Sequence, residues 1–402
     1  MKRLRNCLNT EDFRLAAGRR LPSPLYHYIE GGSDDEVTSG QNTSAYEKYK
    51  FIPRQANGVE SISLKSKVLG MDLDWPLILS PTGMSKLFHP DGEIGVAIAA
   101  KKSGIAYSLS TMATTSIESI AAAISGPKVF QLYLFKDDEL NFEILDRCKA
   151  AGFDAVCLTV DTAIAGNRER DVRTGLTIPP KLSLRSFLEF AFKPQWCLNY
   201  LRGGKFSLPN ISQDKTGDLS VLANYFAENM ESQITWSKVD RIATYWGGPF
   251  AVKGLQSIED VKASKASGAS AVIISNHGGR QLDSVPSSFE LIADIADATG
   301  DTIEIIQDGG IRRGSHIVKS FAMGAKACMT GRPYLYALSA FGGDGVESIL
   351  ESLRMETEKV VGLLGCSNIN EVNREHLRYA NKLPYYLSEA SPAPLNTKIR
   401  RT

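Results

Sequence analysis

The stretch AVIISNHGGRQLD, residues 271–283, sets an apolar run directly before a turn rich in glycine and polar side chains. Two further stretches, EIIQDGG at 304–310 and ACMTGR at 327–332, repeat this order. The residues between them, at 288–298 and 313–323, have helical patterns. A parallel strand that is covered on both faces reads as a continuous run of apolar residues. The region therefore predicts buried parallel strands that alternate with helices.

The same alternation begins at residue 76 and continues through most of the chain. The expected strands span residues 76–80, 106–109, 128–134, 155–161, 250–254, 271–276, 304–308 and 327–331, and the expected helices span 92–103, 116–124, 138–151, 257–267, 288–298 and 313–323. Eight strand–helix units predict an α/β fold of the closed (β/α)8 type, a TIM barrel. An open doubly wound sheet is the alternative, but the G-x-G-x-x-G turn that it would need after a strand is absent.

We expect the whole chain, residues 1–402, to form a single domain around this barrel. Residues 1–75 form an N-terminal helical extension, residues 76–340 form the barrel, and residues 341–402 supply a C-terminal helix and tail. A long loop insertion at 162–249 follows the fourth strand, so the fourth helix must be drawn from it.

The composition excludes several classes of function. The 402 residues include 46 Lys and Arg against 45 Asp and Glu, so the chain lacks the basic surplus of a nucleic-acid binder. The six cysteines form no C-x-x-C pair, which predicts neither a disulfide framework nor a metal site. No signal-peptide core and no run of about 18 apolar residues is visible, so we expect a cytoplasmic protein.

Polar and titratable side chains follow the predicted strands, at the end of the barrel where the active sites of TIM barrels lie. These candidates are Pro81, Thr82, Gly83, Ser110, Gln131, Tyr133, Thr159, Asp161, Lys253, Ser275, His277, Asp308, Gly309, Gly310, Gly331 and Arg332. Because the strands are otherwise apolar, this clustering indicates an enzyme.

Among the five histidines, only His277 directly follows a predicted strand and lies in a glycine-rich turn. An ionised Asp161 across the barrel mouth would stabilise the imidazolium that forms when His277 acts as a general base. Arg168 and Arg280 would together bind a substrate carboxylate through paired hydrogen bonds. The alternatives are a surface histidine at 277 and a solvated charge run at 168–171.

Three further features indicate a cofactor but leave alternatives open. DGGIRRG at 308–314 and MTGRP at 329–333 follow strands seven and eight, where barrels commonly bind phosphate, although tight turns would also need these glycines. Lys253 ends the fifth strand. A buried lysine there is either the Schiff-base nucleophile of an aldolase or a cation beside an electron-rich cofactor.

Residues 177–206 of the insertion mix apolar and basic side chains. The apolar members include Leu184, Phe187, Leu188, Phe192, Trp196 and Tyr200, and the basic members are Arg185, Lys193, Arg202 and Lys205. This mixture is typical of a segment that lies in a membrane interface. A helical flap packed over the barrel mouth is the alternative.

As a set, the motifs YHYIEGGSDDE at 26–36, PTGM, QLY, TVDT, SNHGGRQLD, DGGIRRG and TGRP resemble the FMN-dependent 2-hydroxy acid dehydrogenase and oxidase family. The resemblance runs from residue 26 to about residue 340 and implies an FMN at the barrel mouth. It implies that the flavin rests on Pro81, Thr82 and Gly83, with Ser110, Gln131 and Thr159 at the ring edge and Lys253 near N1 and O2. The remaining implied cofactor-binding residues are Ser275, Asp308, Gly309, Gly310, Arg312, Gly331 and Arg332.

The resemblance also implies roles in the reaction. His277 would accept the proton, paired with Asp161, while Arg168 and Arg280 would bind the carboxylate. Tyr28 and Tyr133 would place their hydroxyls against the carboxylate and the substrate oxygen. Whether C2 loses a proton or a hydride stays open, because both routes use the same base.

The implied activity is the oxidation of an L-2-hydroxy acid to the 2-oxo acid, with L-lactate as the expected substrate. An (S)-mandelate-type dehydrogenase and an O2-using oxidase are the alternatives, and Gly83 and Met112 depart from the pattern of part of the family. The resemblance further implies a quinone or other electron acceptor and a homotetramer. It also implies peripheral attachment through 177–206 to the inner face of the cell membrane.

Overall fold

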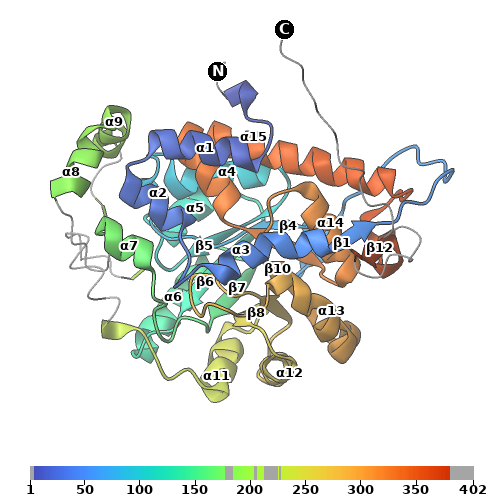
Figure 1. Ribbon diagram of the computed structural model, residues 1–402. Helices are drawn as coiled ribbons and strands as arrows, with labels where there is room; N and C mark the ends of the chain where they lie inside the picture. Colours follow the sequence, from blue (N-terminus) through green and yellow to red (C-terminus); the bar gives the residue numbers. More distant parts are fainter. Residues whose placement is uncertain (1–3, 177–183, 203–205, 212–224, 226–227, 381–402) are drawn as a thin grey trace, which may run out of the picture.

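Eight parallel strands close into a barrel in this computed structural model, which describes residues 4–176, 184–202, 206–211, 225 and 228–380 (Figure 1). The strands are β4 (Leu77–Leu79), β5 (Ala106–Ser110), β6 (Lys128–Tyr133), β7 (Ala155–Thr159), β8 (Phe250–Leu255), β9 (Ala271–Ile274), β10 (Glu304–Asp308) and β11 (Ala327–Thr330). The barrel closes where β11 pairs with β4. Each strand matches a predicted one with small differences at its ends, so the predicted TIM barrel is confirmed.

Helices follow the strands and surround the barrel (Figure 1). They are α4 (Gly92–Lys102), α5 (Ile117–Ala123), α6 (Asp138–Ala150), α11 (Trp236–Trp246), α12 (Ile258–Ala266), α13 (Ser288–Thr299), α14 (Gly314–Met323) and α15 (Arg332–Leu363). As predicted, the fourth of these, α11, comes from the insertion. Helix α15 kinks at Gly342, whose φ is +67°. A Cβ there would lie 2.3 Å from Asp91 Oδ2, so glycine is required.

Two apolar clusters hold the barrel together. One lies between the strands and the surrounding helices. The other fills the barrel interior, where Ile78, Val129 and Ile273 are buried together with Val68 and Met71 of the hairpin β2 (Ser66–Val68) and β3 (Met71–Leu73). Apolar side chains of the strands and of this hairpin fill the barrel interior, whereas the polar residues gather at the strand ends.

The segments outside the barrel begin with three helices, α1 (Thr10–Arg20), α2 (Ser23–Glu30) and α3 (Val37–Ser44). Strand β1 (Tyr49–Phe51) pairs antiparallel with β12 (Leu377–Tyr379). The short 3-10 helices are η1 (Leu4–Asn6), η2 (Ala45–Lys48), η3 (Ser85–Leu87), η4 (Gly300–Thr302), η5 (Ile369–Glu371) and η6 (Arg374–His376). The N-terminal segment is therefore largely helical.

The insertion contributes α7 (Glu169–Thr174), α8 (Leu184–Ala191) and α9 (Pro194–Arg202), and the last two lie at one side of the barrel (Figure 1). Lys193 Nζ donates to the carbonyl of Arg19 at 2.8 Å, and Trp196 Nε1 donates to the carbonyl of Leu87 at 2.8 Å. Trp196, one of the predicted interfacial aromatics, therefore faces the barrel.

Part of the predicted interfacial segment lies outside the described residues. This part comprises residues 177–183 and 203–205, which include Lys205, together with the side chains of Leu184, Arg185 and Phe187. Among the residues that the structure does describe, no helix is long and apolar enough to cross a membrane.

Candidate active site

A cavity of about 630 Å³ opens at the carboxyl ends of the strands. The site residues predicted from the sequence that line this cavity are Tyr28, Pro81, Thr82, Gly83, Ser110, Gln131, Tyr133, Thr159, Arg168, Lys253, His277, Arg280, Asp308, Gly309, Gly310, Arg312, Gly331 and Arg332. Two predicted residues, Asp161 and Ser275, do not line it. The structure therefore brings nearly all of the candidates together, although they come from segments far apart in the sequence.

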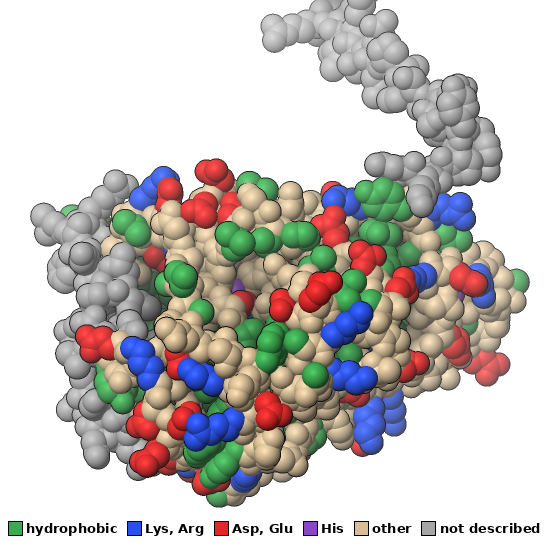
Figure 2. Space-filling model, turned by 90° about the horizontal axis from the view of Figure 1, so that it is seen from below, with side chains coloured by type: hydrophobic (Ala, Val, Ile, Leu, Met, Phe, Trp, Pro, Cys, Tyr) green, Lys and Arg blue, Asp and Glu red, His purple; other side chains and the backbone are tan. Residues whose placement is uncertain are grey.

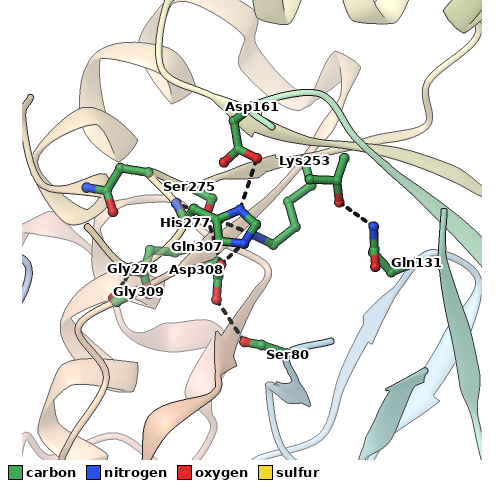
Figure 3. A network of polar contacts seen from close by, with 12 residues as sticks. Ser80, Gln131, Asp161, Lys253, Ser275, His277, Gly278, Gln307, Asp308 and Gly309 are labelled. Atoms are coloured by element: carbon green, nitrogen blue, oxygen red, sulfur yellow. Dashed lines mark hydrogen bonds and ion pairs between the residues drawn. The ribbon is translucent and has the colours of Figure 1, made fainter. Parts of the chain in front are cut away.

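His277 and Asp161 form a pair at the edge of the cavity. The distance between His277 Nδ1 and Asp161 Oδ1 is 3.0 Å (Figure 3). His277 has a φ of +56°, a left-handed conformation that is costly for a residue with a side chain. Burial would raise the pKa of Asp161, but His277 and Lys253 lower it below its ordinary value. Burial lowers the pKa of His277, and Asp161 opposes this shift.

These shifts define the protonation states of the pair at neutral pH. An ionised carboxylate can only accept hydrogen bonds, so Nδ1 of His277 carries the proton that Asp161 accepts. The lone pair of the neutral ring is then on Nε2. Because Asp161 does not itself line the cavity, its contribution is to orient His277 and to stabilise the imidazolium.

Lys253 and Asp308 form a buried ion pair in the floor of the cavity. Lys253 Nζ lies 2.8 Å from Asp308 Oδ2, and the Ser275 hydroxyl donates to the same oxygen at 2.8 Å. The other oxygen of Asp308 accepts from Ser80 at 2.8 Å (Figure 3). Burial would lower the pKa of Lys253, but Asp308 and Asp161 raise it above its ordinary value. Lys253 is therefore an ammonium group, and Ser275 supports it from behind the cavity wall.

A row of three polar side chains crosses the ends of β5, β6 and β7. The Ser110 hydroxyl donates to Gln131 Oε1 at 3.0 Å, and Gln131 Nε2 donates to Thr159 Oγ1 at 3.0 Å. All three residues are buried and line the cavity. The row presents fixed donors and acceptors to a flat polar ligand.

Two guanidinium groups, those of Arg168 and Arg280, face the cavity beside the buried carboxylate of Asp171, whose charge partly offsets theirs. Arg280 donates to the carbonyls of Tyr28 and Gly31 at 2.6 and 2.9 Å, and Arg168 donates to the carbonyl of Arg280 at 3.3 Å. Burial and the charge of Arg168 lower the pKa of Arg280 to about 9. This repulsion between two cations is relieved when an anion binds between them.

Tyrosine side chains complete this side of the cavity. The Arg280 guanidinium lies 4.9 Å from the centre of the Tyr28 ring. Tyr28 in turn stacks on Phe88, with a ring separation of 6.2 Å. Burial raises the pKa of Tyr133, so its hydroxyl remains protonated. Both tyrosines line the cavity.

The glycine turns after β10 and β11 also line the cavity. Gly309 and Gly310 have φ values of +109° and +77°. Arg332 donates to the carbonyls of Ile29, Gly278 and Gly31 at 2.8 to 2.9 Å, which uses three of its five N–H groups. The remaining two can serve an anion.

Sequence reasoning missed several residues that shape the site. Gln281 Nε2 donates to the carbonyls of Asp161 and Ile164 at 2.7 and 2.8 Å, so it holds the loop that carries Asp161. Gln281 belongs to the SNHGGRQLD stretch that carries His277 and Arg280, and this position in the sequence could have identified it as a site residue. The carboxylate of Glu93 is fully buried and accepts hydrogen bonds from Ser85, Thr114 and Thr115. Nothing in its helical pattern distinguishes it from an exposed residue.

Opposite charges are interspersed on the face shown in Figure 2, without a large area of one sign. This distribution agrees with the formal net charge of +1. No cluster of His, Cys, Asp and Glu among the described residues is suited to hold a metal ion. None of the six cysteines forms a disulfide bond.

Comparison with known proteins gives a consistent result. The model of a family described as FMN-dependent dehydrogenase matches residues 17–379. L-lactate dehydrogenase of Acinetobacter baylyi is 36% identical over 378 residues, which are 93% of this chain and 98% of that protein. Glycolate oxidase 3 of Arabidopsis thaliana is 35% identical over 94% of this chain and 98% of its own length.

The solved structures agree with these sequences. A structure described as the monotopic membrane protein (S)-mandelate dehydrogenase superposes with a TM-score of 0.89 at 35% identity, covering 93% of this chain and 100% of that chain. A mandelate oxidase variant in complex with (S)-mandelic acid has a TM-score of 0.78 at 31% identity, with 92% and 98% coverage.

Proposed function

The chain belongs to the FMN-dependent dehydrogenase family, and from that premise we propose that it oxidises L-lactate, an L-2-hydroxy acid, to the 2-oxo acid. The observation that carries this proposal is the convergence of a neutral, carboxylate-oriented His277 and two cations, Arg168 and Arg280, on one cavity. A 2-hydroxy acid needs both features, because it carries an anion beside the hydroxyl that loses its proton.

The residues of the cavity fit an FMN. The hydroxyls of Thr330 and Thr162 are buried in the cavity wall without a hydrogen-bond partner among the described residues, which leaves polar atoms for a ligand. Lys253 and the row Ser110, Gln131 and Thr159 would hold the ring, and the turns after β10 and β11 would hold the ribityl phosphate. When bound, FMN accepts the two electrons that leave C2 of the substrate.

The remaining chemistry is assigned to the side chains of this chain. Arg168 and Arg280 bind the substrate carboxylate, and the hydroxyls of Tyr28 and Tyr133 donate to substrate oxygens. The Nε2 atom of His277 accepts the proton of the substrate. Asp161 then stabilises the positive ring through the hydrogen bond at Nδ1, which strengthens as the ring becomes charged.

A Schiff-base aldolase would use Lys253 in a different way. Its amine would have to be neutral to attack a carbonyl, whereas Asp308 and Asp161 raise its pKa and keep it charged. We therefore assign Lys253 to charge stabilisation beside the cofactor. Borohydride trapping of a substrate on Lys253 would contradict this assignment.

The substrate is tested by comparing kcat/KM, with a dye as electron acceptor, for L-lactate, L-mandelate, glycolate and D-lactate. We expect L-lactate to be preferred and D-lactate to be inactive, because the base would hold the hydroxyl and the two guanidinium groups the carboxylate. With these two groups held, only one enantiomer would turn its C2–H bond toward the cofactor. Met112 and Ala165 line the cavity, so they limit the size of the substrate side chain that fits. A preference for L-mandelate would show that this space takes a phenyl group and would make L-mandelate the substrate in place of L-lactate. Turnover of D-lactate at a comparable rate would contradict the proposed geometry.

We propose that α8 and α9 attach the protein to an anionic membrane surface and that a quinone is the electron acceptor. Phe192 and Leu201 are 79% and 78% exposed, and Arg202, the residue after Leu201, is exposed too. Exposed apolar side chains next to basic ones favour a lipid interface. Reduction of a quinone analogue without hydrogen peroxide would support a dehydrogenase, whereas stoichiometric peroxide would identify an O2-using oxidase.

Membrane attachment is tested by sedimentation with vesicles that contain anionic lipid. We expect the wild-type chain to sediment and the double variant Phe192→Asp/Leu201→Asp to remain in the supernatant. Met355→Asp, at a position 56% exposed on α15, is the matched control. Equal sedimentation of all three proteins would contradict the assignment of α8 and α9. The homotetramer stays a prediction, which sedimentation velocity tests.

A further inference from the structure

The loop after β10 is pressed against the N-terminal segment on the side away from the cavity. Its inner side, Gly309 to Arg312, lines the cavity, whereas the residues behind it do not. A Cβ at Gly310 would lie only 1.8 Å from the carbonyl oxygen of Asn42. The shape of this loop therefore depends on what supports it from behind.

His316 and Tyr46 form that support. The two rings are stacked with centroids 4.2 Å apart and an interplanar angle of 7°. Tyr46 is fully buried, and its ring also packs against that of Phe289, with the ring centroids 4.2 Å apart. His316 lies in the first turn of α14, so the stack connects this helix to η2.

The ring of His316 is tied to the loop backbone through Nδ1. This atom lies 3.2 Å from the carbonyl oxygen of Gly310 and 3.3 Å from the amide nitrogen of Arg312. In one neutral tautomer Nδ1–H donates to Gly310, and in the other the lone pair accepts from Arg312. Burial, with Lys319 and Arg312 nearby, lowers the pKa of His316 to about 4, so the ring is neutral at physiological pH.

We propose that His316 is a positioning residue that holds the loop at 309–312 in the conformation that binds the phosphate end of FMN. Backbone N–H groups in a glycine turn bind an anion only when they converge, and a loop with two positive-φ glycines has many alternatives to that arrangement. A contact at Gly310 or Arg312 from a rigid, stacked ring reduces those alternatives. The inference rests on the proposed assignment of this loop to the phosphate.

The test compares two flavins that differ only in the phosphate. FMN and riboflavin are titrated into the full-length chain after its bound flavin has been removed, and the dissociation constants are measured by quenching of flavin fluorescence. His316→Phe keeps an aromatic ring against Tyr46 but removes Nδ1. We expect it to weaken FMN binding by roughly 2- to 13-fold, as for the loss of one hydrogen bond, and to leave riboflavin binding unchanged.

Two further variants separate positioning from general stability. His316→Asn restores a polar atom near the position of Nδ1 and should recover most of the affinity for FMN. His376→Phe is the matched control, because His376 is also buried but its ring contacts Cys366 and Asn373 outside the cavity. It should leave the ratio of the two dissociation constants unchanged.

The possible failures are distinguishable. If the wild-type chain binds FMN and riboflavin equally well, the assignment of the loop to the phosphate is wrong. If the wild-type chain prefers FMN and His316→Phe has the same preference, only the role of His316 is overturned. An equal loss of affinity for both flavins in His316→Phe would also overturn it, because that result indicates general damage to the fold.

Discussion

Replacing Asp161 with asparagine isolates the charge that stabilises the protonated base. The hydrogen bond between His277 Nδ1 and Asp161 Oδ1 is 3.0 Å long and lies in a partly buried setting. Hydrogen bonds to charged groups contribute about 1.5–3 kcal/mol, and 1.36 kcal/mol corresponds to a factor of ten. We therefore expect Asp161→Asn to lower kcat/KM by about 10- to 150-fold.

The same variant predicts a shift in the pH profile with a defined sign. Burial lowers the pKa of His277, and the negative charge of Asp161 opposes that shift. Without the charge the pKa of His277 falls further, so the acid limb of the profile of kcat/KM moves to lower pH while the plateau falls. The assay is steady-state turnover of L-lactate with a dye acceptor between pH 4 and 9.

A surface aspartate provides the control for this experiment. Asp138 pairs with Arg241 at 2.6 Å, but both side chains are about half exposed, and such pairs contribute little. Asp138→Asn should leave the plateau and the acid limb unchanged. The reasoning would be refuted by an Asp161→Asn variant with an unmoved acid limb and a plateau within about threefold of the wild-type value.

Three other substitutions have expected outcomes. Lys253→Met leaves Asp308 buried without its cation, so urea denaturation should show a loss of about 3–5 kcal/mol in the free energy of unfolding. The double variant Lys253→Met/Asp308→Asn should regain part of this loss, and an unchanged denaturation midpoint in Lys253→Met would contradict a stabilising buried ion pair. Glu93→Gln presents an amide donor to Ser85, Thr114 and Thr115, which are themselves donors, so the two loops that carry them lose their common anchor and KM should rise. Unchanged KM and unchanged stability would show that the anchor is dispensable. Trp196→Phe keeps the ring but loses the bond to Leu87, so limited proteolysis should cut near α9 faster than in the wild-type chain; identical digestion rates would contradict this docking contact.

The barrel could be predicted because each of its strands is a continuous apolar run with a turn behind it. Residues at the carboxyl ends of parallel strands must meet at one end of a barrel, so the proximity of Lys253, His277 and Asp308 followed from the strand pattern. The expected range 155–161 was too long, because β7 ends at Thr159 and Asp161 lies in the turn beyond it. That turn places Asp161 behind His277 instead of in the cavity wall.

Other features depend on contacts between segments that the sequence pattern does not relate. Glu93 has the position of an ordinary first-turn carboxylate, and only the fold shows that Ser85 of one loop and Thr114 and Thr115 of another donate to it. His316 belongs to a predicted helix, and its stacking partner Tyr46 is 270 positions earlier. Composition alone places Trp196 among the interfacial aromatics, because it does not show which face of a helix docks.

The proposed reaction depends most directly on His277 as the base in a flavin-dependent oxidation. The decisive measurement is the rate at which L-lactate bleaches the yellow colour of the bound FMN without oxygen, in the wild-type chain and in His277→Asn. We predict rapid bleaching of the wild-type protein and bleaching about 10² to 10⁴ times slower in a variant that still binds FMN. Equal rates in the two proteins would contradict the role of His277 as the base, and a wild-type flavin that no 2-hydroxy acid bleaches would contradict the proposed reaction.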